Sequence, residues 1–284
     1  MAARDVLISG CGSGIGWATA LEFARAGDRV WAGVRSERDA VRLRQAAADE
    51  VLDIRPVPLD VRSPEDVLAA VRTVLATSGG LDVLVNNAAI FQVAPVETTT
   101  DEDAALLFEV NLLGPLRLIR AVLPVMRERG GVVVNVSSVN GFLAAPFSAL
   151  YSATKFALEG LSEALQAEVL PFGIRVVLAE PGGFRTGMAA RARASGGAVP
   201  EAYRDAVRRM AELRDAGLRD APDVRLAARE IYLCTARAGQ PLRQPIGPAA
   251  VQLRELRGHS DEEIISQIGR RLWAEEPKAA GHPA

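Results

Sequence analysis

Ser138, Tyr151 and Lys155 are three side chains that together can move a proton to or from an oxygen atom. Tyr151 and Lys155 are four residues apart, so in a helix they share one face. A Tyr phenol has an ordinary pKa of about 10, and a neighbouring ammonium group lowers it. Ser138, thirteen residues earlier, can donate a hydrogen bond to the same oxygen. The trio therefore predicts acid–base chemistry at a carbonyl or hydroxyl group.

Residue usage strengthens this prediction, because a Tyr-x-x-x-Lys pair alone is common on ordinary helices. Of the 33 basic residues only Lys155 and Lys278 are Lys, and Lys278 lies in a Pro- and Ala-rich tail. The Asn residues are also concentrated, since all of them fall in one third of the chain, beside predicted strand ends or in one predicted helix. They are Asn86, Asn87, Asn111, Asn135 and Asn140.

A glycine-rich turn runs from Gly10 to Gly16, between the first predicted strand and the first predicted helix. Glycine lets backbone N–H groups approach a phosphate, and the helix N-terminus adds a favourable dipole. The spacing is G-x-x-x-G-x-G, and the alternative is a turn that binds nothing. We predict that this turn binds a cofactor phosphate through Gly10, Ser13, Gly14, Ile15 and Gly16.

Arg35 stands at the end of the second predicted strand, and no acidic residue follows before Glu37. In a dinucleotide fold an acid at this place favours NAD, whereas a basic residue accommodates the 2′-phosphate of NADP. The alternative is a solvated Arg in an Arg-rich protein. The sequence therefore predicts NADP(H) as the cofactor.

Short apolar segments alternate with longer amphipathic ones along most of the chain. The apolar segments are rich in Val, Ile and Leu, as in strands covered on both faces. They span 6–9, 29–34, 54–59, 83–85, 132–136 and 174–179, with a short edge strand expected in 243–251. The amphipathic segments span 15–26, 37–49, 64–77, 101–129, 149–170 and 222–236. This alternation predicts an α/β fold: a doubly wound, Rossmann-type parallel sheet of about seven strands in a three-layer sandwich.

The domain organisation follows from where this alternation stops. We predict one domain over residues 1–252. Within it the pattern breaks from 182 to 220, with no strand-like run, so about 183–221 is expected to cover the substrate as a lid. Residues 253–284 are expected to form an extension that is helical over 254–273 and frayed over 277–284.

Composition excludes several classes of protein. The net charge of -2 gives no electrostatic argument for nucleic acid. Two Cys, Cys11 and Cys234, exclude a disulfide scaffold and a Cys-rich zinc site, and no metal is expected. Two His near the C-terminus leave no Ser-His-Asp triad in the body of the chain. No apolar run reaches the ~20 residues of a membrane span, and we expect a cytoplasmic protein.

Taken together, these motifs resemble the short-chain dehydrogenase/reductase family, in its main single-domain branch, over about residues 4–252. The glycine turn and the Ser-Tyr-Lys trio match its cofactor loop and catalytic residues. Ala89 replaces the last Gly of its N-N-A-G turn. Further matches are Asp60 and Val61 at the adenine, Asn87 and Ala88 in that turn, Asn111 as the residue that holds a relay water, and Pro181, Gly182, Phe184 and Thr186 in its P-G-x-x-x-T segment.

The resemblance implies hydride transfer between a nicotinamide and a carbonyl or secondary alcohol, with carbonyl reduction favoured. Cys11, Ser13 and Arg35 make the chain similar to NADP-dependent 17β-hydroxysteroid and retinol dehydrogenases. Tyr151 is implied as acid or base, while Lys155 lowers its pKa and binds the nicotinamide ribose. A homodimer or homotetramer and a small-molecule substrate are implied, with substrate contacts at Gln92, Asn140, Phe142, Leu143 and Met188.

Two alternatives to the reductase stay open. The same fold could run a non-redox isomerisation or dehydration, although an intact trio argues against this. The chain could also be a cofactor-binding regulator without activity, but such a protein has no need of Ser138, Tyr151 and Lys155 together.

Overall fold

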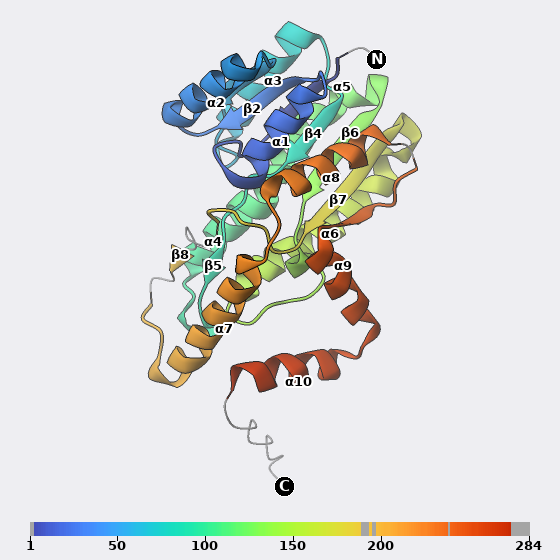
Figure 1. The fold of residues 1–284 in the computed structure, drawn as a ribbon. Helices are drawn as coiled ribbons and strands as arrows, with labels where there is room; N and C mark the ends of the chain where they lie inside the picture. The colour runs from blue at the N-terminus through green and yellow to red at the C-terminus, as the bar shows by residue number, and fades with distance from the viewer. Residues whose placement is uncertain (1–2, 189–192, 195–196, 238, 274–284) are drawn as a thin grey trace.

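A parallel sheet of seven strands forms the centre of the protein, in the order β3-β2-β1-β4-β6-β7-β9 (Figure 1). The computed structural model describes residues 3–188, 193–194, 197–237 and 239–273. The strands are β1 (Asp5–Ile8), β2 (Arg29–Val34), β3 (Ile54–Pro58), β4 (Val83–Asn86), β6 (Gly131–Val136), β7 (Ile174–Pro181) and β9 (Arg243–Ile246). The predicted strands and the doubly wound Rossmann-type fold are confirmed, including the short strand at the edge.

Helices cover both faces of the sheet and divide the core into two layers. One layer packs α1 (Gly14–Arg25), α2 (Glu37–Glu50) and α8 (Val224–Ala236) against the sheet. The other packs α3 (Pro64–Ser78), α5 (Gly114–Arg129) and α6 (Ala149–Val169) against the opposite face. Because the side chains of one strand alternate between the two layers, both faces of the central strands are mainly apolar. The buried polar residues Asn86, Asn135 and Glu180 are exceptions in β4, β6 and β7.

The segment 101–129 differs from the single helix that the sequence predicts. It consists of α4 (Asp101–Phe108), one π-helical turn, η2 (Glu109–Leu113), and α5. A π turn adds one residue to the helix, so it rotates the residues that follow, and such turns are frequent at functional sites. Asn111, a predicted site residue, lies in this turn.

The segments whose secondary structure was predicted least accurately lie beyond the carboxyl ends of the strands. The prediction of no strand in 182–220 is wrong, because β5 (Gln92–Val93) pairs with β8 (Arg193–Ala194) in a separate two-stranded sheet. The helix α7 (Glu201–Arg219) follows. The C-terminal region forms α9 (Pro248–Glu255), a short turn η6 (Leu256–Gly258) and α10 (Asp261–Leu272). The predicted frayed tail, 277–284, lies outside the described residues.

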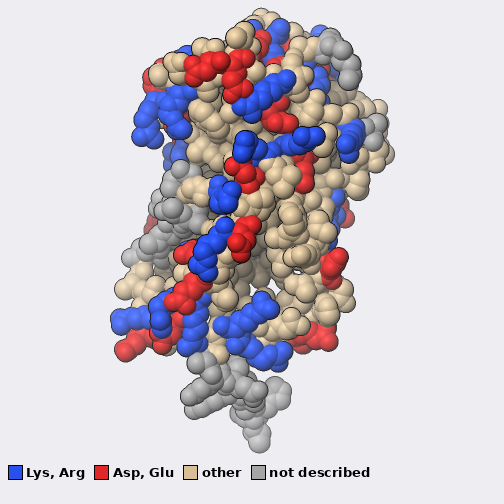
Figure 2. Space-filling model, viewed as in Figure 1, with Lys and Arg blue, Asp and Glu red and all other residues tan. Residues whose placement is uncertain are grey.

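Short 3-10 turns complete the described elements, at η1 (Val96–Thr98), η3 (Val139–Gly141) and η4 (Leu170–Phe172). No helix in the described part of the chain has the length and apolarity to cross a lipid bilayer. On the face drawn in Figure 2, basic and acidic side chains are interspersed among the described residues, so that face has no continuous patch of one charge.

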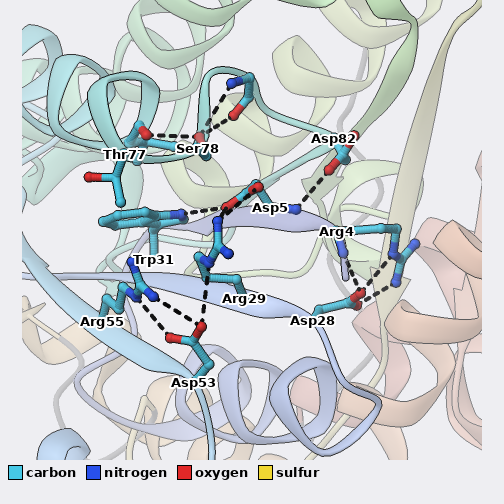
Figure 3. A network of polar contacts seen from close by, with 12 residues as sticks. Arg4, Asp5, Asp28, Arg29, Trp31, Asp53, Arg55, Thr77, Ser78 and Asp82 are labelled. Atoms are coloured by element: carbon cyan, nitrogen blue, oxygen red, sulfur yellow. Dashed lines mark hydrogen bonds and ion pairs between the residues drawn. The ribbon is translucent and has the colours of Figure 1, made fainter. Parts of the chain in front are cut away.

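A network of charged side chains closes the end of the sheet opposite to the carboxyl ends of the strands (Figure 3). Arg4 binds Asp28 through Nη2 at 2.6 Å and Nε at 3.1 Å. Beside them, Asp5 accepts hydrogen bonds from Arg29 and from the indole of Trp31. The carboxylate of Asp28 is 7% exposed, so solvent screens this ion pair less than a surface pair.

Replacement of Asp28 with Asn should lower the free energy of unfolding by about 1–3 kcal/mol, because it leaves the half-buried Arg4 without its counter-charge. Urea unfolding followed by circular dichroism measures this change. Asp53→Asn is the matched control, since Asp53 also binds arginines but is 45% exposed, and its cost should stay below about 1 kcal/mol. Equal costs for the two variants would contradict the prediction.

Candidate active site

The predicted catalytic trio comes together where β6 ends and α6 begins. Ser138 follows β6, and Tyr151 and Lys155 lie one turn apart in α6. The Nζ atom of Lys155 donates a hydrogen bond of 2.8 Å to the carbonyl of Val136, the last residue of β6, and lies 5.7 Å from the centroid of the Tyr151 ring. The lysine thus joins strand and helix at the edge of the sheet where ligands bind in α/β folds.

Tyr151 lies in an apolar environment. Its side chain is buried, and the ring of Phe91 packs against it edge to face, with ring centroids 4.9 Å apart. Burial raises the pKa of the phenol to about 12, while its hydrogen bond with Ser138 acts in the opposite direction. The sequence predicted that Lys155 would lower this pKa. Desolvation is the largest cause of the shift and the Ser138 hydrogen bond is the cause that opposes it, so the effect of Lys155 stays a prediction.

Lys155 is 2% exposed, so its ammonium group has lost almost all of its hydration. Burial lowers its pKa to about 8, and the charge of Glu159 one turn later raises it. Lys155 therefore stays largely protonated at neutral pH and loses its proton as the pH rises through about 8.

Asn111 uses its side-chain amide to hold the loop after β4. Its Oδ1 accepts a hydrogen bond from the backbone N–H of Ile90, and its Nδ2 donates to the Ile90 carbonyl and to Thr154 in α6. The amide thereby fixes the backbone just before Phe91 against the helix that carries Tyr151. A water held by Asn111 stays a prediction, but the side chain is already engaged by protein groups.

The glycine turn is packed closely against the end of β4. Gly10 has φ +73°, which favours glycine, and an added Cβ would lie 2.8 Å from the Cα of Ala88. The Asn87 amide donates to the carbonyls of Ser9 and Gly10 at 2.9 and 3.2 Å. A Cβ on Gly16 would overlap both this amide and the Gly10 carbonyl. Only glycine fits at Gly10 and Gly16, and side-chain-free positions of this kind let the backbone of the turn come close to a ligand.

The same turn suits a phosphate. Gly14, with φ +60°, begins α1, and there is no acidic residue in the first turn of that helix. The positive end of the helix dipole is thus not neutralised by a carboxylate of its own turn. Thr186 lies beside Gly14, 3.5 Å from where a Cβ would stand. These residues fit the phosphates of a dinucleotide between the glycine turn and the segment after β7.

Arg35 lies exposed at the end of β2, beside the predicted adenosine site. Arg62 donates hydrogen bonds to both carboxylate oxygens of Asp60, the shortest being 2.6 Å from Nη2 to Oδ2. These hydrogen bonds lower the pKa of Asp60, and the charge of Arg35 adds a smaller effect in the same direction. Arg35 is therefore near Asp60. Val61, the other predicted adenine residue, is buried and packs against Gly114.

The segment after β7 returns toward the glycine turn. Pro181 ends β7, and Gly182 lies close to Ala250 at the start of α9. The side chain of Phe184 is 4% exposed and packs against Gly247, while its carbonyl accepts a 2.8 Å hydrogen bond from the N–H of Thr186. The predicted cofactor residues of this segment thus line the carboxyl end of β7.

The residues predicted at the substrate differ in their surroundings. The N–H of Asn140 donates to the Ser138 hydroxyl at 3.1 Å, which places Asn140 beside the trio. Phe142 lies under the guanidinium of Arg254, 4.6 Å away, on the side of α9. Gln92 is 4% exposed, and its Nε2 has no hydrogen-bond partner among the residues that the structure describes. Leu143 and Met188 are partly exposed.

Three residues of the site were missed in the sequence. Phe91 follows the Asn-Asn-Ala-Ala turn by one residue, but nothing local shows that its ring reaches Tyr151. Glu159 is on the Lys155 face of α6, four residues on, and could have been found from this spacing. Glu180, the residue before Pro181, lies near Glu159 in the fold, but nothing in the local sequence indicates this contact.

Comparison with known proteins decides the family. A family model described as short chain dehydrogenase matches residues 4–196. The chain belongs to the short-chain dehydrogenase family. It is 32% identical over 250 residues to a 3-ketodihydrosphingosine reductase of Bacteroides thetaiotaomicron, covering 87% of this chain and 89% of the relative. It is 39% identical to human 17-beta-hydroxysteroid dehydrogenase type 1 over 66% of this chain, and this match spans only 58% of the human protein.

Solved structures agree with this assignment. A short-chain dehydrogenase from Streptomyces avermitilis superposes with a TM-score of 0.81 at 40% identity, over 92% of this chain and 94% of that one. A gluconate 5-dehydrogenase from Burkholderia cenocepacia, solved with NADP and tartrate, has a TM-score of 0.63 at 34% identity, over 66% and 74% of the two chains. This short-chain dehydrogenase is therefore an oxidoreductase of the NAD(P)-dependent class.

Proposed function

We propose that this short-chain dehydrogenase uses NADP(H) and reduces the carbonyl group of a small molecule to an alcohol. The observation that carries the proposal is the buried Tyr151 phenol, hydrogen-bonded to Ser138 and one turn from the ammonium group of Lys155. With its pKa raised to about 12, this phenol holds its proton at neutral pH, as a proton donor in carbonyl reduction must.

The chemistry divides between the cofactor and the protein. When bound, the nicotinamide supplies the hydride for the carbonyl carbon. Tyr151 donates its phenolic proton to the carbonyl oxygen, and the Ser138 hydroxyl donates a hydrogen bond to the same oxygen. The phenolate that remains is stabilised by the Lys155 ammonium group until a proton from solvent restores it.

The cofactor site extends from the glycine turn to the segment after β7. The turn at Gly10–Gly16 would hold the pyrophosphate, and Asp60 and Val61 would flank the adenine. Arg35 and Ser13 would contact the 2′-phosphate. In support, the similar gluconate 5-dehydrogenase was solved with NADP. The remaining proposed contacts are Asn87, Ala88, Tyr151, Lys155, Pro181, Gly182, Phe184 and Thr186.

The proposed substrate is a moderately apolar carbonyl compound. Phe91 beside Tyr151 and the half-buried Leu143 support this class. Tyr203 of α7 packs edge to face on Phe147, with centroids 6.3 Å apart, which supports α7 as the part of segment 183–221 that covers the substrate. Residues 189–192 and 195–196 of that predicted lid lie outside the described residues. Two relatives also carry the names of a ketone reductase and a hydroxysteroid dehydrogenase.

The test of the proposed function is NADPH oxidation with a panel of ketones, aldehydes and steroid-like carbonyls, with NADH in parallel. Turnover that prefers NADPH supports the whole proposal. A preference for NADH would leave the reductase but overturn the role of Arg35. Cofactor binding without turnover of any carbonyl would favour the isomerase or the regulator instead.

Arg35→Ala should lower kcat/KM for NADPH about 10- to 100-fold and leave kcat/KM for NADH nearly unchanged, because only NADPH carries a 2′-phosphate that can form a charge-assisted hydrogen bond with Arg35. Steady-state kinetics with both cofactors measure the ratio. Arg38→Ala is the matched control, since Arg38 is three residues away and its side chain is 84% exposed. Equal losses for the two cofactors would contradict the assignment.

A cytoplasmic homo-oligomer completes the proposal. Leu113 in η2 and Phe156 in α6 are apolar side chains exposed by 36% and 43%, which a contact between subunits would bury. Cys11 and Cys234 are both free, as the reducing cytoplasm favours. Light scattering coupled to gel filtration tests the dimer or tetramer directly.

A further inference from the structure

Two carboxyl groups are buried directly behind the proposed catalytic trio. Glu159 in α6 is 5% exposed and lies one turn after Lys155. Glu180 in β7 is 0% exposed and precedes Pro181. Within the described part of the chain, each has one oxygen that no donor meets in good hydrogen-bond geometry, Oε1 of Glu159 and Oε2 of Glu180. Unpartnered oxygens of buried carboxylates are costly, so this pair needs an explanation.

Two arginines bring the carboxyl groups together. Nε of Arg243 lies 3.0 Å from Glu159 Oε2 and 3.9 Å from Glu180 Oε1, so both carboxyl groups share this guanidinium. Arg254 of α9 binds Glu180 Oε1 at 3.0 Å. Arg243 also reaches Glu163 on the exposed side of α6, at 2.8 Å.

Two carboxylates that share one guanidinium in a buried site repel each other, so the state in which both are charged is costly at neutral pH. Burial raises the pKa of Glu180 to about 7, and the charge of Glu159 and a hydrogen bond between the two carboxyl groups add to this shift. Burial also raises the pKa of Glu159, although a hydrogen bond with Ser137 and the charge of Arg243 oppose it. A proton held between the two groups supplies a donor to an oxygen that neither arginine reaches.

The pair touches the catalytic residues on two sides. The Glu159 charge acts on Lys155 along α6. A Cβ added to Gly141 would lie 3.0 Å from Glu159 Oε1 and also meet Ser137, so Glu159 supports the loop that contains Ser138. A surface cleft lined by Glu159, Gly160 and three arginines, Arg243, Arg254 and Arg257, brings solvent to the Glu159 side of the pair.

We propose that Glu159 and Glu180 share one proton at neutral pH and below, and that the pair is a positioning group that keeps Lys155 an ammonium ion beside Tyr151. The charged groups that face the pair are Lys155 and Glu163 of α6, Arg243 of β9 and Arg254 of α9. The proposal deepens the proposed function, on which it rests only for its kinetic consequence.

The test uses the small number of lysines. The chain has two, Lys155 and Lys278, so the variant Lys278→Arg labelled with ¹³C-lysine gives one Lys155 signal by NMR. In that background Glu159→Gln should lower the Lys155 pKa by about one unit, because it removes the nearest negative charge from a buried site. Glu180→Gln should lower it less, since Glu159 stays ionised. Glu163→Gln is the matched control, because it binds the same Arg243 but is 65% exposed, and it should leave the Lys155 pKa unchanged.

The shared proton has its own readout. In wild-type protein labelled with ¹³C-glutamate, the signal of one carboxyl group should titrate near pH 7, because burial raises the pKa of Glu180 to about 7. Each single Gln variant should remove one partner and lower the pKa of the other. Because the wild-type titration needs no substitution, it decides the proposal even where a variant does not fold.

Turnover, once a substrate is found, adds a readout that a purely structural role would not move. The alkaline limb of the kcat/KM profile should shift to lower pH in Glu159→Gln and stay in place in Glu163→Gln. The proposal would be overturned if Lys155 titrates alike in wild type and in Glu159→Gln. Equal shifts of the Lys155 pKa in Glu159→Gln and in Glu163→Gln would overturn it as well. NMR outcomes as expected without any carbonyl turnover would overturn the proposed function instead.

Discussion

Tyr151→Phe lowers kcat/KM for carbonyl reduction by about 10³-fold, the loss expected when a positioned proton donor is removed. The substitution deletes only the hydroxyl. The ring keeps its edge-to-face contact with Phe91, and its burial is unchanged, so the fold and the cofactor site should be preserved. NADPH oxidation measures the loss, and fluorescence quenching by NADPH measures cofactor binding, which should stay within about threefold of wild type because the lost hydroxyl makes at most one hydrogen bond.

The matched control for this variant is Tyr232→Phe. Tyr232 lies in α8, on the other face of the sheet, and its ring packs against Phe23 in the core at 5.2 Å. Its hydroxyl has no part in the proposed chemistry, so turnover should be unaffected. A Tyr151→Phe enzyme that keeps a tenth or more of wild-type activity would show that another group donates the proton.

The parts of the site that the sequence predicted depend on local spacing. Tyr151 and Lys155 face the same way because both are in one helix, and the glycine turn needs only the strand before it and the helix after it. Parallel strands then bring Ser138 to the same edge, since their carboxyl ends meet there. The alternation of segments was enough for this, and it also predicted the sheet.

The parts that the sequence did not predict depend on contacts between distant segments. Glu180 meets Glu159 only because β7 lies beside β6 and α6, and Arg243 and Arg254 come from β9 and α9, far along the chain. The pKa of Tyr151 follows from burial, which Phe91 helps to create from another loop. The π turn at Asn111 did have a local signal that the single predicted helix missed, because Gly114 and Pro115 follow it and a Pro removes one backbone hydrogen bond of a helix.

Gly16→Val should be the most damaging substitution in the proposed cofactor site. A Cβ there would overlap the Gly10 carbonyl, which is backbone, and the Asn87 amide that bridges β1 and β4. Neither group can move without opening the glycine turn. We expect NADPH binding about 100-fold weaker and a loss of about 1–3 kcal/mol in the free energy of unfolding, the range for overpacked sites.

Fluorescence titration with NADPH and urea unfolding measure the two effects separately. The matched control is Gly269→Ala in α10, where an added Cβ meets nothing within 4 Å, so that helix should gain stability and NADPH should bind as in wild type. Since both variants enlarge a helical glycine, only the surroundings differ between them. Wild-type NADPH affinity in Gly16→Val would mean that the turn has room to spare, and the phosphate would then have to bind elsewhere than against the Gly10–Gly16 backbone.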